Sequence, residues 1–355
     1  MTVFIIWHLF LLSMQTVQRA LHHYNMANIT VVTGFFLMGF SNTWELQVLH
    51  AILFLLIYLL TLMGNLLIFT LISLDGKLHT PMYFFLKNLS FLDLCLVSVT
   101  VPKSIANSLS NSYNISFWGC VSQLFLMMLF AASEIFLLTV MSYDRYVAIC
   151  QPLHYEVIMK SETCLKMAIA CWLTGGLLGV LHTASTFTLP FCGSKEIPQF
   201  FCDVPALVRI SCSDSHLAVD VTMTLASTLG IFCSIYITIS YSHIISTVLK
   251  IPVKESRSKA FSTCLPHLMV FMFFITTCMI AYLMPPQESY PVLDLLFSIF
   301  YTVMPPTLNP FIYSLRNKDI KTALRKLIAC KYFSRGLIPN FFPLFYACAD
   351  IFKPK

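Results

Sequence analysis

An aspartate and an arginine stand side by side in Met141-Ser-Tyr-Asp-Arg-Tyr-Val-Ala-Ile-Cys150, at the end of a long apolar segment. Ionisable side chains are costly at membrane depth, so a pair at a membrane boundary suggests a function. The composition agrees with a membrane setting, because 57% of the residues are hydrophobic and only 11% are charged. In soluble domains, roughly a quarter of the residues are charged. The sequence therefore predicts an all-α membrane protein.

The hydrophobic residues gather in windows of the length that a membrane span requires, which is about 20 mostly apolar residues. Seven windows qualify, at roughly 47–74, 82–105, 118–146, 165–188, 216–246, 260–284 and 292–314. We therefore predict a seven-helix bundle at 47–314. A short amphipathic helix is expected on the membrane surface at 315–329, with an apolar face of Ile320, Ala323, Leu324 and Leu327.

Basic residues set the orientation, since Lys and Arg concentrate on the cytoplasmic side of membrane proteins. Of the 22 basic residues, 15 fall on the side that holds the tail, four on the other side and three within spans or at their ends. The segment 26–46 is therefore expected outside the cell. Two glycosylation acceptors, at Asn28 and Asn114, fall on this outer side.

Several function classes find no support in the residues. The chain has no Gly-rich phosphate loop, no Cys-x-x-Cys and no His-Glu-x-x-His motif. Its basic residues form short runs beside the membrane spans, which argues against nucleic-acid binding. The histidines are scattered, so a membrane enzyme is disfavoured. A transporter or channel would be expected to show internal repeats or interrupted helices, and the sequence shows neither.

Three further motifs accompany the first one in order along the chain. They are Leu78-His-Thr-Pro-Met-Tyr-Phe-Phe-Leu86, Lys259-Ala-Phe-Ser-Thr-Cys264 and Pro306-Thr-Leu-Asn-Pro-Phe-Ile-Tyr-Ser-Leu-Arg-Asn317. Together they resemble the odorant receptor branch of the rhodopsin-like G-protein-coupled receptors, from about Met26 to about Leu327. The resemblance implies a seven-transmembrane receptor in the plasma membrane, without enzymatic activity.

The resemblance also implies partners. A small, volatile, mostly apolar ligand would bind within the bundle, and a stimulatory G protein of the olfactory type would raise cyclic AMP. Trafficking helpers and membrane lipids are further expected partners, and no cofactor is expected apart from a sodium ion considered below. Receptors for amines carry an aspartate where this chain has Met127, so an amine ligand would lack its counter-ion.

The resemblance assigns a conformational switch to residues near the cytoplasmic side. In the resting receptor Asp144 would hold Arg145, and release would let Arg145 meet Tyr313 and the G protein. Pro310 removes one backbone donor and allows a helix kink. The complete expected set is Asp144, Arg145, Tyr146, Tyr241, Asn309, Pro310 and Tyr313. For any one of these residues alone, a packing or kink role is the favoured interpretation, whereas their joint occurrence at the ends of the spans favours the switch.

A second set of polar residues falls within the spans. Asn65, Asp93, Glu134 and Asn309 match positions that converge below the ligand pocket in the receptor fold. Two carboxylates there would hold a sodium ion or share a proton. The alternative is a hydrogen-bonded clamp between helices without an ion.

Helix position predicts a ligand site in the outer half of the bundle. A pocket for odorants should be largely apolar with few polar anchors, and methionines adapt to varied shapes. The expected contacts are Met127, Met128, Ala131, Ala132, Val204, Leu225, Cys278, Tyr282 and Thr302. Only Tyr282 and Thr302 offer evident hydrogen bonds, and a Met–Ala face of a helix is also compatible with plain packing.

Four of the 13 cysteines fall in predicted outer loops, where disulfides form. Four cysteines allow three pairings, between which the spacing alone does not choose. The resemblance implies Cys120 with Cys202 and Cys192 with Cys212.

The two ends of the chain depart from the family. Residues 1–25 precede the start that the resemblance implies at Met26. The predicted cytoplasmic tail at 330–355 contains an unusually apolar segment, Phe341-Phe-Pro-Leu-Phe-Tyr346, which is too short to span a membrane. These departures leave open a receptor-shaped product that no longer signals.

Overall fold

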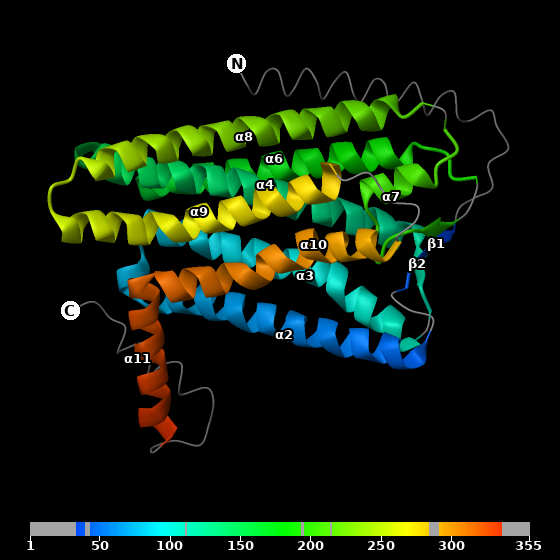
Figure 1. Ribbon diagram of the computed structural model, residues 1–355, viewed down its shortest axis with the longest axis horizontal. Helices are drawn as coiled ribbons and strands as arrows, with labels where there is room; N and C mark the ends of the chain where they lie inside the picture. Colours follow the sequence, from blue (N-terminus) through cyan, green and yellow to red (C-terminus); the bar gives the residue numbers. More distant parts are fainter. Residues whose placement is uncertain are drawn as a thin grey trace.

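The computed structural model describes residues 33–39, 43–110, 112–192, 195–213, 215–283 and 291–335. Long helices dominate this part of the chain and run side by side in one bundle (Figure 1). They are α2 (Trp44–Leu74), α3 (Pro81–Ser110), α4 (Phe117–Cys150), α6 (Ser161–Phe187), α8 (Leu217–Leu249), α9 (Lys254–Leu283) and α10 (Pro291–Arg316). Each one contains most or all of a predicted span.

Length and composition of the helices fit a membrane. Six helices of the described part are long and apolar enough to cross one, namely α2, α3, α4, α6, α8 and the Ala260–Thr277 part of α9. The helix α10 occupies the place of the seventh predicted span. Apolar side chains remain exposed along α2 and α8, as lipid contact requires.

The bundle is organised around α4, which contacts α3, α6, α8 and α9. On the other side, α10 packs against α2, α3 and α9. Close approach of α2 and α10 depends on Gly64, because a Cβ there would lie 2.9 Å from Cβ of Pro310. The buried core runs through the centre of the bundle and includes Met127, Tyr241 and Tyr313.

One end of the bundle, here called the sheet end, is closed by short strands. β1 (Gly34–Leu37) pairs antiparallel with β2 (Asn114–Ser116) and parallel with β3 (Glu196–Ile197). The short helix α7 (Val204–Arg209) lies beside them (Figure 1). The sequence did not predict this sheet. Strands of two to four residues leave no periodic signal, and their partners are far apart in the chain.

Two disulfides join elements at the sheet end. Cys120 at the start of α4 is bonded to Cys202, and Cys192 is bonded to Cys212. The Cα atoms lie 5.5 and 5.9 Å apart, within the usual range. These are the pairings that the resemblance implies.

The opposite end, here called the Arg145 end, carries shorter elements. A 3₁₀ turn at Gly76–Leu78 connects α2 with α3, and a second one at Pro152–His154 leads into α5 (Tyr155–Ile158). After α10, the helix α11 (Lys318–Arg335) leaves the bundle at a steep angle (Figure 1). Lys326 of α11 forms an ion pair with the buried Asp75, with Nζ and Oδ2 2.7 Å apart.

Two helices extend beyond the predicted ranges. The helix α2 begins at Trp44, so the predicted outer segment 26–46 includes its first residues. The helix predicted at 315–329 begins at Lys318 and continues to Arg335. The chain has no glycine or proline between these two residues, and Gly336 follows directly, which explains the longer helix. The predicted extension 1–25 and residues 336–355 of the predicted tail 330–355 lie outside the described residues, whereas 330–335 belong to α11.

Candidate functional site

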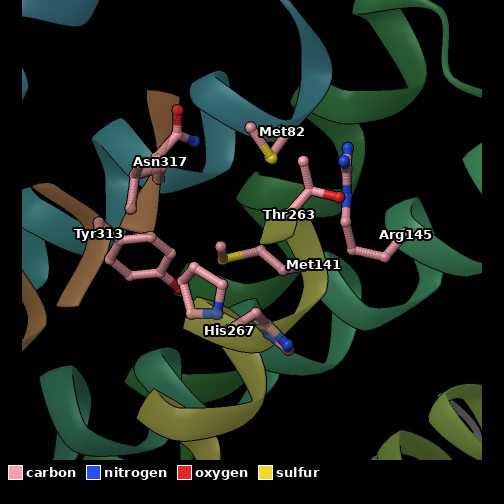
Figure 2. A pocket seen from close by; sticks show the side chains of 9 residues that line it. Met82, Met141, Arg145, Thr263, His267, Tyr313 and Asn317 are labelled. Carbon is pink, nitrogen blue, oxygen red and sulfur yellow. The ribbon is translucent and has the colours of Figure 1, made fainter. Parts of the chain in front are cut away.

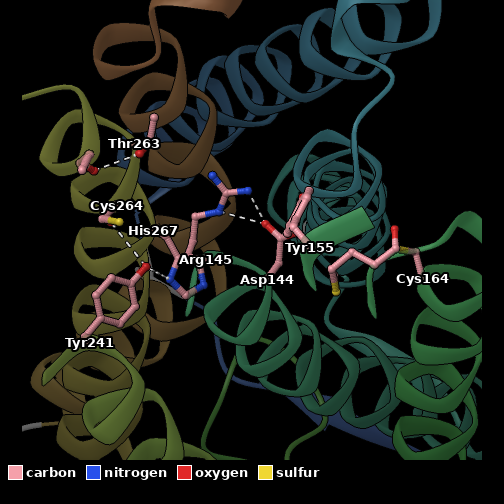
Figure 3. Close-up of polar contacts among 10 residues, drawn as sticks. Asp144, Arg145, Tyr155, Cys164, Tyr241, Thr263, Cys264 and His267 are labelled. Carbon is pink, nitrogen blue, oxygen red and sulfur yellow. Dashed lines mark hydrogen bonds and ion pairs between the residues drawn. The ribbon is translucent and has the colours of Figure 1, made fainter. Parts of the chain in front are cut away.

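The aspartate–arginine pair lies at the end of α4 and is closed on itself (Figure 3). Arg145 Nε donates to Asp144 Oδ2 at 2.8 Å, and Arg145 Nη2 also contacts this oxygen. The second oxygen, Asp144 Oδ1, accepts from Tyr155 Oη at 2.8 Å. Because Asp144 is fully buried, these donors replace the water that a carboxylate would otherwise bind. Arg145 is thereby held by its own neighbour.

Tyr155 is a member of this site that the sequence did not reveal. It begins α5, in the connection between α4 and α6. Burial, and then the negative charge of Asp144, raise the pKa of the Tyr155 phenol. The hydroxyl therefore keeps its proton and acts as a donor to Asp144. Only the fold of the connection brings residues 144 and 155 together, so no sequence pattern could show the contact.

His267 holds Tyr241 and is a second member missed as a site residue (Figure 3). The Nε2 atom lies 3.0 Å from the carbonyl oxygen of Leu138, and Nδ1 lies 2.8 Å from Tyr241 Oη. A carbonyl only accepts, so Nε2 carries the proton and Nδ1 accepts from the tyrosine. The ring of His267 also stacks on that of Tyr241. Tyr241 is therefore tied to α9 and α4 through this histidine.

A small cavity lies between Arg145 and Tyr313 (Figure 2). Its volume is about 10 Å³, the space of roughly one water molecule. His267 and Met141 also line this cavity. The buried hydroxyl of Tyr313 has no hydrogen-bond partner among the described residues. Of the predicted switch residues, Arg145 and Tyr313 line this cavity, and Tyr241 is bonded to His267, which also lines it.

Two other residues of the predicted switch lie apart from this cavity. Tyr146 is half-buried and faces α8, where its ring meets the edge of His243. Pro310 lies within α10 and packs at Gly64 of α2. Proline has no N–H, so the carbonyl four residues earlier, at Pro306, loses its helical partner. Asn65 Nδ2 donates to that oxygen at 2.9 Å.

The predicted polar cluster forms, but without Asn65. Asn309 Nδ2 lies 3.1 Å from both carboxylate oxygens of Asp93 and 3.5 Å from Glu134 Oε1. Asp93 and Glu134 are fully buried, and Glu134 Oε2 has no partner in the described part of the chain. Asn65 instead completes the hydrogen bonding of α10 at Pro306. Across the described residues, no group of three or more His, Cys, Asp and Glu side chains could hold a metal ion.

The comparison with known proteins decides the family. The sequence model described as olfactory receptor matches residues 54–331. The chain belongs to the olfactory receptor family. Olfactory receptor 14A2 of Homo sapiens is 59% identical over 307 residues, which cover 86% of this chain and 98% of the relative. Olfactory receptor 14A16 of Homo sapiens is 58% identical over 306 residues, covering 86% and 99%.

The fold of the receptor is similar to that of a solved structure. The crystal structure of squid rhodopsin matches with a TM-score of 0.65 at 16% identity, covering 85% of this chain and 82% of that one. The receptor therefore has the seven-transmembrane fold of rhodopsin-like G-protein-coupled receptors. It is a multi-pass membrane protein and a receptor rather than an enzyme. Its family implies a small-molecule ligand and a G protein as partners.

The predicted ligand contacts are spread over several elements of the receptor. Met128 packs against the apolar cluster at the sheet end to which Val204 belongs, whereas Met127 belongs to the central core. Ala131 and Ala132 are half-buried on α4, and Leu225 is half-buried on α8. These contacts bring only Met128 and Val204 together.

Of the two predicted hydrogen-bonding residues of the pocket, only Thr302 has a described side chain. Thr302 on α10 is buried, and its hydroxyl donates to the carbonyl of Ser298 at 2.6 Å. Thr302 therefore keeps only acceptor capacity for a ligand. The helix α9 contains positions 278 and 282, but the side chains of Cys278 and Tyr282 lie outside the described part.

Of the two predicted glycosylation sites, only Asn114 lies within the described residues. Asn114 is exposed on β2, so its side chain is accessible at the sheet end. Asn28 lies outside the described residues.

Hydrogen bonds attach the loop after β3 to the bundle, which the sequence did not show. Gln123 on α4 accepts from the backbone N–H of Cys202 at 2.9 Å and donates to the carbonyl of Val99 at 3.0 Å. Asp203 Oδ2 accepts from Tyr301 Oη of α10 at 2.5 Å. Burial raises the pKa of Asp203 to about 6, although hydrogen bonds from Tyr301 and the Val204 N–H lower it.

Proposed function

We propose that this receptor binds small, mostly apolar odorants in the outer half of its bundle and activates a stimulatory G protein of the olfactory type, raising cyclic AMP. The observation that supports this most is the closed arrangement around Arg145. The arginine is paired with Asp144, Tyr241 is paired with His267, and Tyr313 has a free hydroxyl beside the same cavity. These groups are poised to exchange partners.

Activation would rearrange these contacts. Arg145 would leave Asp144 and Tyr155, and Tyr241 would leave His267 as α9 moves. The guanidinium could then donate to Tyr313 across the cavity that separates them now, and to Tyr241 once its bond to His267 is broken. A ligand shifts such an equilibrium only by binding the active arrangement more tightly than the resting one. The hydrogen bond of Tyr241 to His267 contributes about 1 kcal/mol, and each bond to the charged Asp144 about 1.5–3 kcal/mol, so the ligand's differential affinity has to match a few kcal/mol.

The ligand would meet an apolar surface. Met128, Val204 and the half-buried alanines of α4 offer shape without charge. Met127 stands where amine receptors carry an acid, so a cationic ligand would have no counter-ion at this position. Thr302, together with Tyr282 on α9, is proposed to orient the ligand by hydrogen bonds. Neutral odorants with at most a few polar atoms suit this set of residues.

The buried carboxylates are proposed to hold a sodium ion or to share a proton. Two carboxylates bridged by one amide leave Glu134 Oε2 unpartnered, which fits a small cation or a proton at that oxygen. If sodium binds, replacing choline chloride by sodium chloride should raise the thermal stability of the purified receptor. Asp93→Asn should remove that increase, whereas an unchanged sodium effect in this variant would exclude the cluster as the site.

We propose that the sheet end faces the outside of the cell at the plasma membrane. The disulfides, the exposed Asn114 and the excess of basic residues at the Arg145 end support this orientation.

The test is a cyclic-AMP reporter assay in cells that supply the olfactory G protein and trafficking helpers. A broad odorant panel is applied to the full chain and to a form starting at Met26. We expect a concentration-dependent response that Arg145→Ala abolishes while surface display stays normal. A response that persists in Arg145→Ala would contradict the proposed switch. Silence of the displayed receptor across the panel would favour a product that does not signal.

A further inference from the structure

A groove lies between α4 and α6 near the sheet end, away from the contacts described above. It is a shallow, open groove with a volume of about 370 Å³. Its walls are Trp118, Val121, Ser122 and Phe125 of α4 with Val180, Thr183 and Ala184 of α6. None of these described lining residues is charged.

The groove follows from how the two helices pack. Nearer the middle of the bundle they touch backbone to backbone, because a Cβ on Gly175 would lie 2.7 Å from the carbonyl oxygen of Leu129. A Cβ on Gly179 would lie 3.1 Å from the carbonyl oxygen of Phe125. Beyond Gly179 the residues of α6 carry side chains, and Ala184 is too small to fill the space beside α4.

The mouth of the groove faces the membrane. Trp118 is 76% exposed and Val180 is 45% exposed, on two helices long and apolar enough to span a bilayer. Tryptophan is enriched where a membrane meets water, and Trp118 stands at the first turn of its span. An occupant would therefore enter from the lipid and lie near the polar boundary of the bilayer.

Thr183 contributes a buried hydroxyl group to the groove. The residue is only 8% exposed, and its hydroxyl has no hydrogen-bond partner among the described residues. On the same helix, Thr174 Oγ1 donates to the carbonyl of Ala170 at 2.8 Å, whereas the buried hydroxyl of Thr186 also has no partner among the described residues. Buried polar groups are nearly always paired, so the Thr183 hydroxyl calls for a partner.

A second hydroxyl complements the first. Ser122 Oγ donates to the carbonyl of Gly119 at 3.1 Å, which leaves its oxygen free to accept. The groove can therefore give one hydrogen bond from Thr183 and take one at Ser122. A ligand hydroxyl both accepts and donates, so a single hydroxyl group would satisfy both residues.

We propose that this groove binds a membrane sterol, with the sterol hydroxyl between Thr183 and Ser122 and the flat apolar body against Phe125 and Val180. The absence of charged lining residues selects against phospholipids, whose phosphate would have no partner there. A neutral lipid with one hydroxyl at the bilayer boundary matches the depth, the opening and the two polar groups. The site is separate from the odorant contacts, so it stands whether or not those are correct.

The experiment uses the purified full-length receptor in lipid nanodiscs and a sterol that carries a photoreactive group in its ring body. Saturable labelling is measured against sterol concentration, and the labelled peptides are mapped by mass spectrometry. We expect labels on the 118–125 and 180–184 segments. Thr183→Val keeps the shape and removes the hydroxyl, and should raise the half-saturating concentration about fivefold, which is the loss of one neutral hydrogen bond.

Controls make the result specific. Thr174→Val lies on the same helix with a satisfied hydroxyl and should label like the wild type. Ala184→Phe should fill the groove and abolish saturable labelling. On the unaltered receptor, a sterol methylated at its hydroxyl should compete at least fivefold less well, which tests the hydroxyl without any substitution. Equal competition by the methylated sterol, by a phospholipid or by apolar odorants would overturn the proposal, as would labelling elsewhere.

Discussion

The two ends of the bundle are held together by different kinds of bond. At the sheet end, two disulfides and a three-stranded sheet join α4, the segment before α2 and the loop after β3. At the Arg145 end, the ties between helices described above are single hydrogen bonds and ion pairs. Asp144 binds Tyr155, and His267 binds Tyr241. The sheet end is therefore held by covalent bonds, whereas the Arg145 end is held by contacts that can be exchanged.

This difference indicates where the receptor moves. Removing a disulfide costs roughly 2–5 kcal/mol, whereas one hydrogen bond contributes about 1 kcal/mol. A ligand that contributes a few kcal/mol of differential affinity can rearrange the Arg145 end but leaves the sheet end closed. The proposed ligand site lies between the two ends, so a change that begins there should be transmitted to the Arg145 end.

Removing a disulfide at the sheet end should have the strongest consequence for the receptor. Cys120→Ser or Cys202→Ser should remove most surface display, because the bond closes a loop of 82 residues and lies in a buried cluster. Cys192→Ser should be milder, since its bond spans 20 residues between exposed positions. Surface staining of tagged receptor in intact cells measures both. Normal display of the first two variants would show that the closure is dispensable.

Removing a hydrogen bond at the Arg145 end should have a smaller consequence. His267→Phe keeps a ring but removes the acceptor for Tyr241 and the bond to Leu138, so the resting arrangement is weakened. Basal cyclic-AMP signalling should rise by about fivefold for each kcal/mol lost. His243→Phe is the matched control, because His243 is an exposed histidine of α8 that contacts only the ring of Tyr146 among the contacts described here. Unchanged basal signalling in His267→Phe would remove this residue from the switch.

The smallest effect concerns pH at the sheet end. The pKa of Asp203 is raised to about 6, so the folded receptor binds this proton more tightly than the unfolded chain. The stabilisation is complete below the unfolded pKa of about 4 and is lost as the pH rises through about 6.

This sign gives a measurable difference. Between about pH 7.5 and pH 5, wild-type stability should rise by roughly 1 kcal/mol relative to Asp203→Asn, which cannot titrate. Thermal unfolding of the two purified receptors at each pH gives the comparison, in which groups common to both cancel. A constant difference across this range would mean that Asp203 does not titrate there.

The sequence was most informative where the bundle obeys simple rules. Apolar windows predicted each long helix, and the position of Asp144 and Arg145 at the end of one window predicted a boundary pair. The grouping of Asp93, Glu134 and Asn309 came from the resemblance to a family, as did the pairing of the cysteines. These features depend on local hydrophobicity or on motifs that a family shares.

Other contacts depend on tertiary geometry that no window contains. The bond of Tyr301 to Asp203 joins residues 98 positions apart, and His267 reaches Leu138 across 129. Asn65 was expected beside Asp93, but the carbonyl released by Pro310 is its partner. The short strands at the sheet end carry too few residues to show alternation. Packing, rather than pattern, places these groups.

On activation, the Arg145 end is expected to open while the sheet end stays closed. The most direct test is a pulsed electron resonance distance measurement with genetically encoded spin labels, which avoids the native cysteines. One pair is placed at exposed positions of the Arg145 end, Val157 and Ser258, and the other at the sheet end, Leu109 and Leu217. With agonist and G protein, the first distance should lengthen and the second should stay constant. An equal change in both pairs, or a fixed first distance in a signalling receptor, would contradict the account.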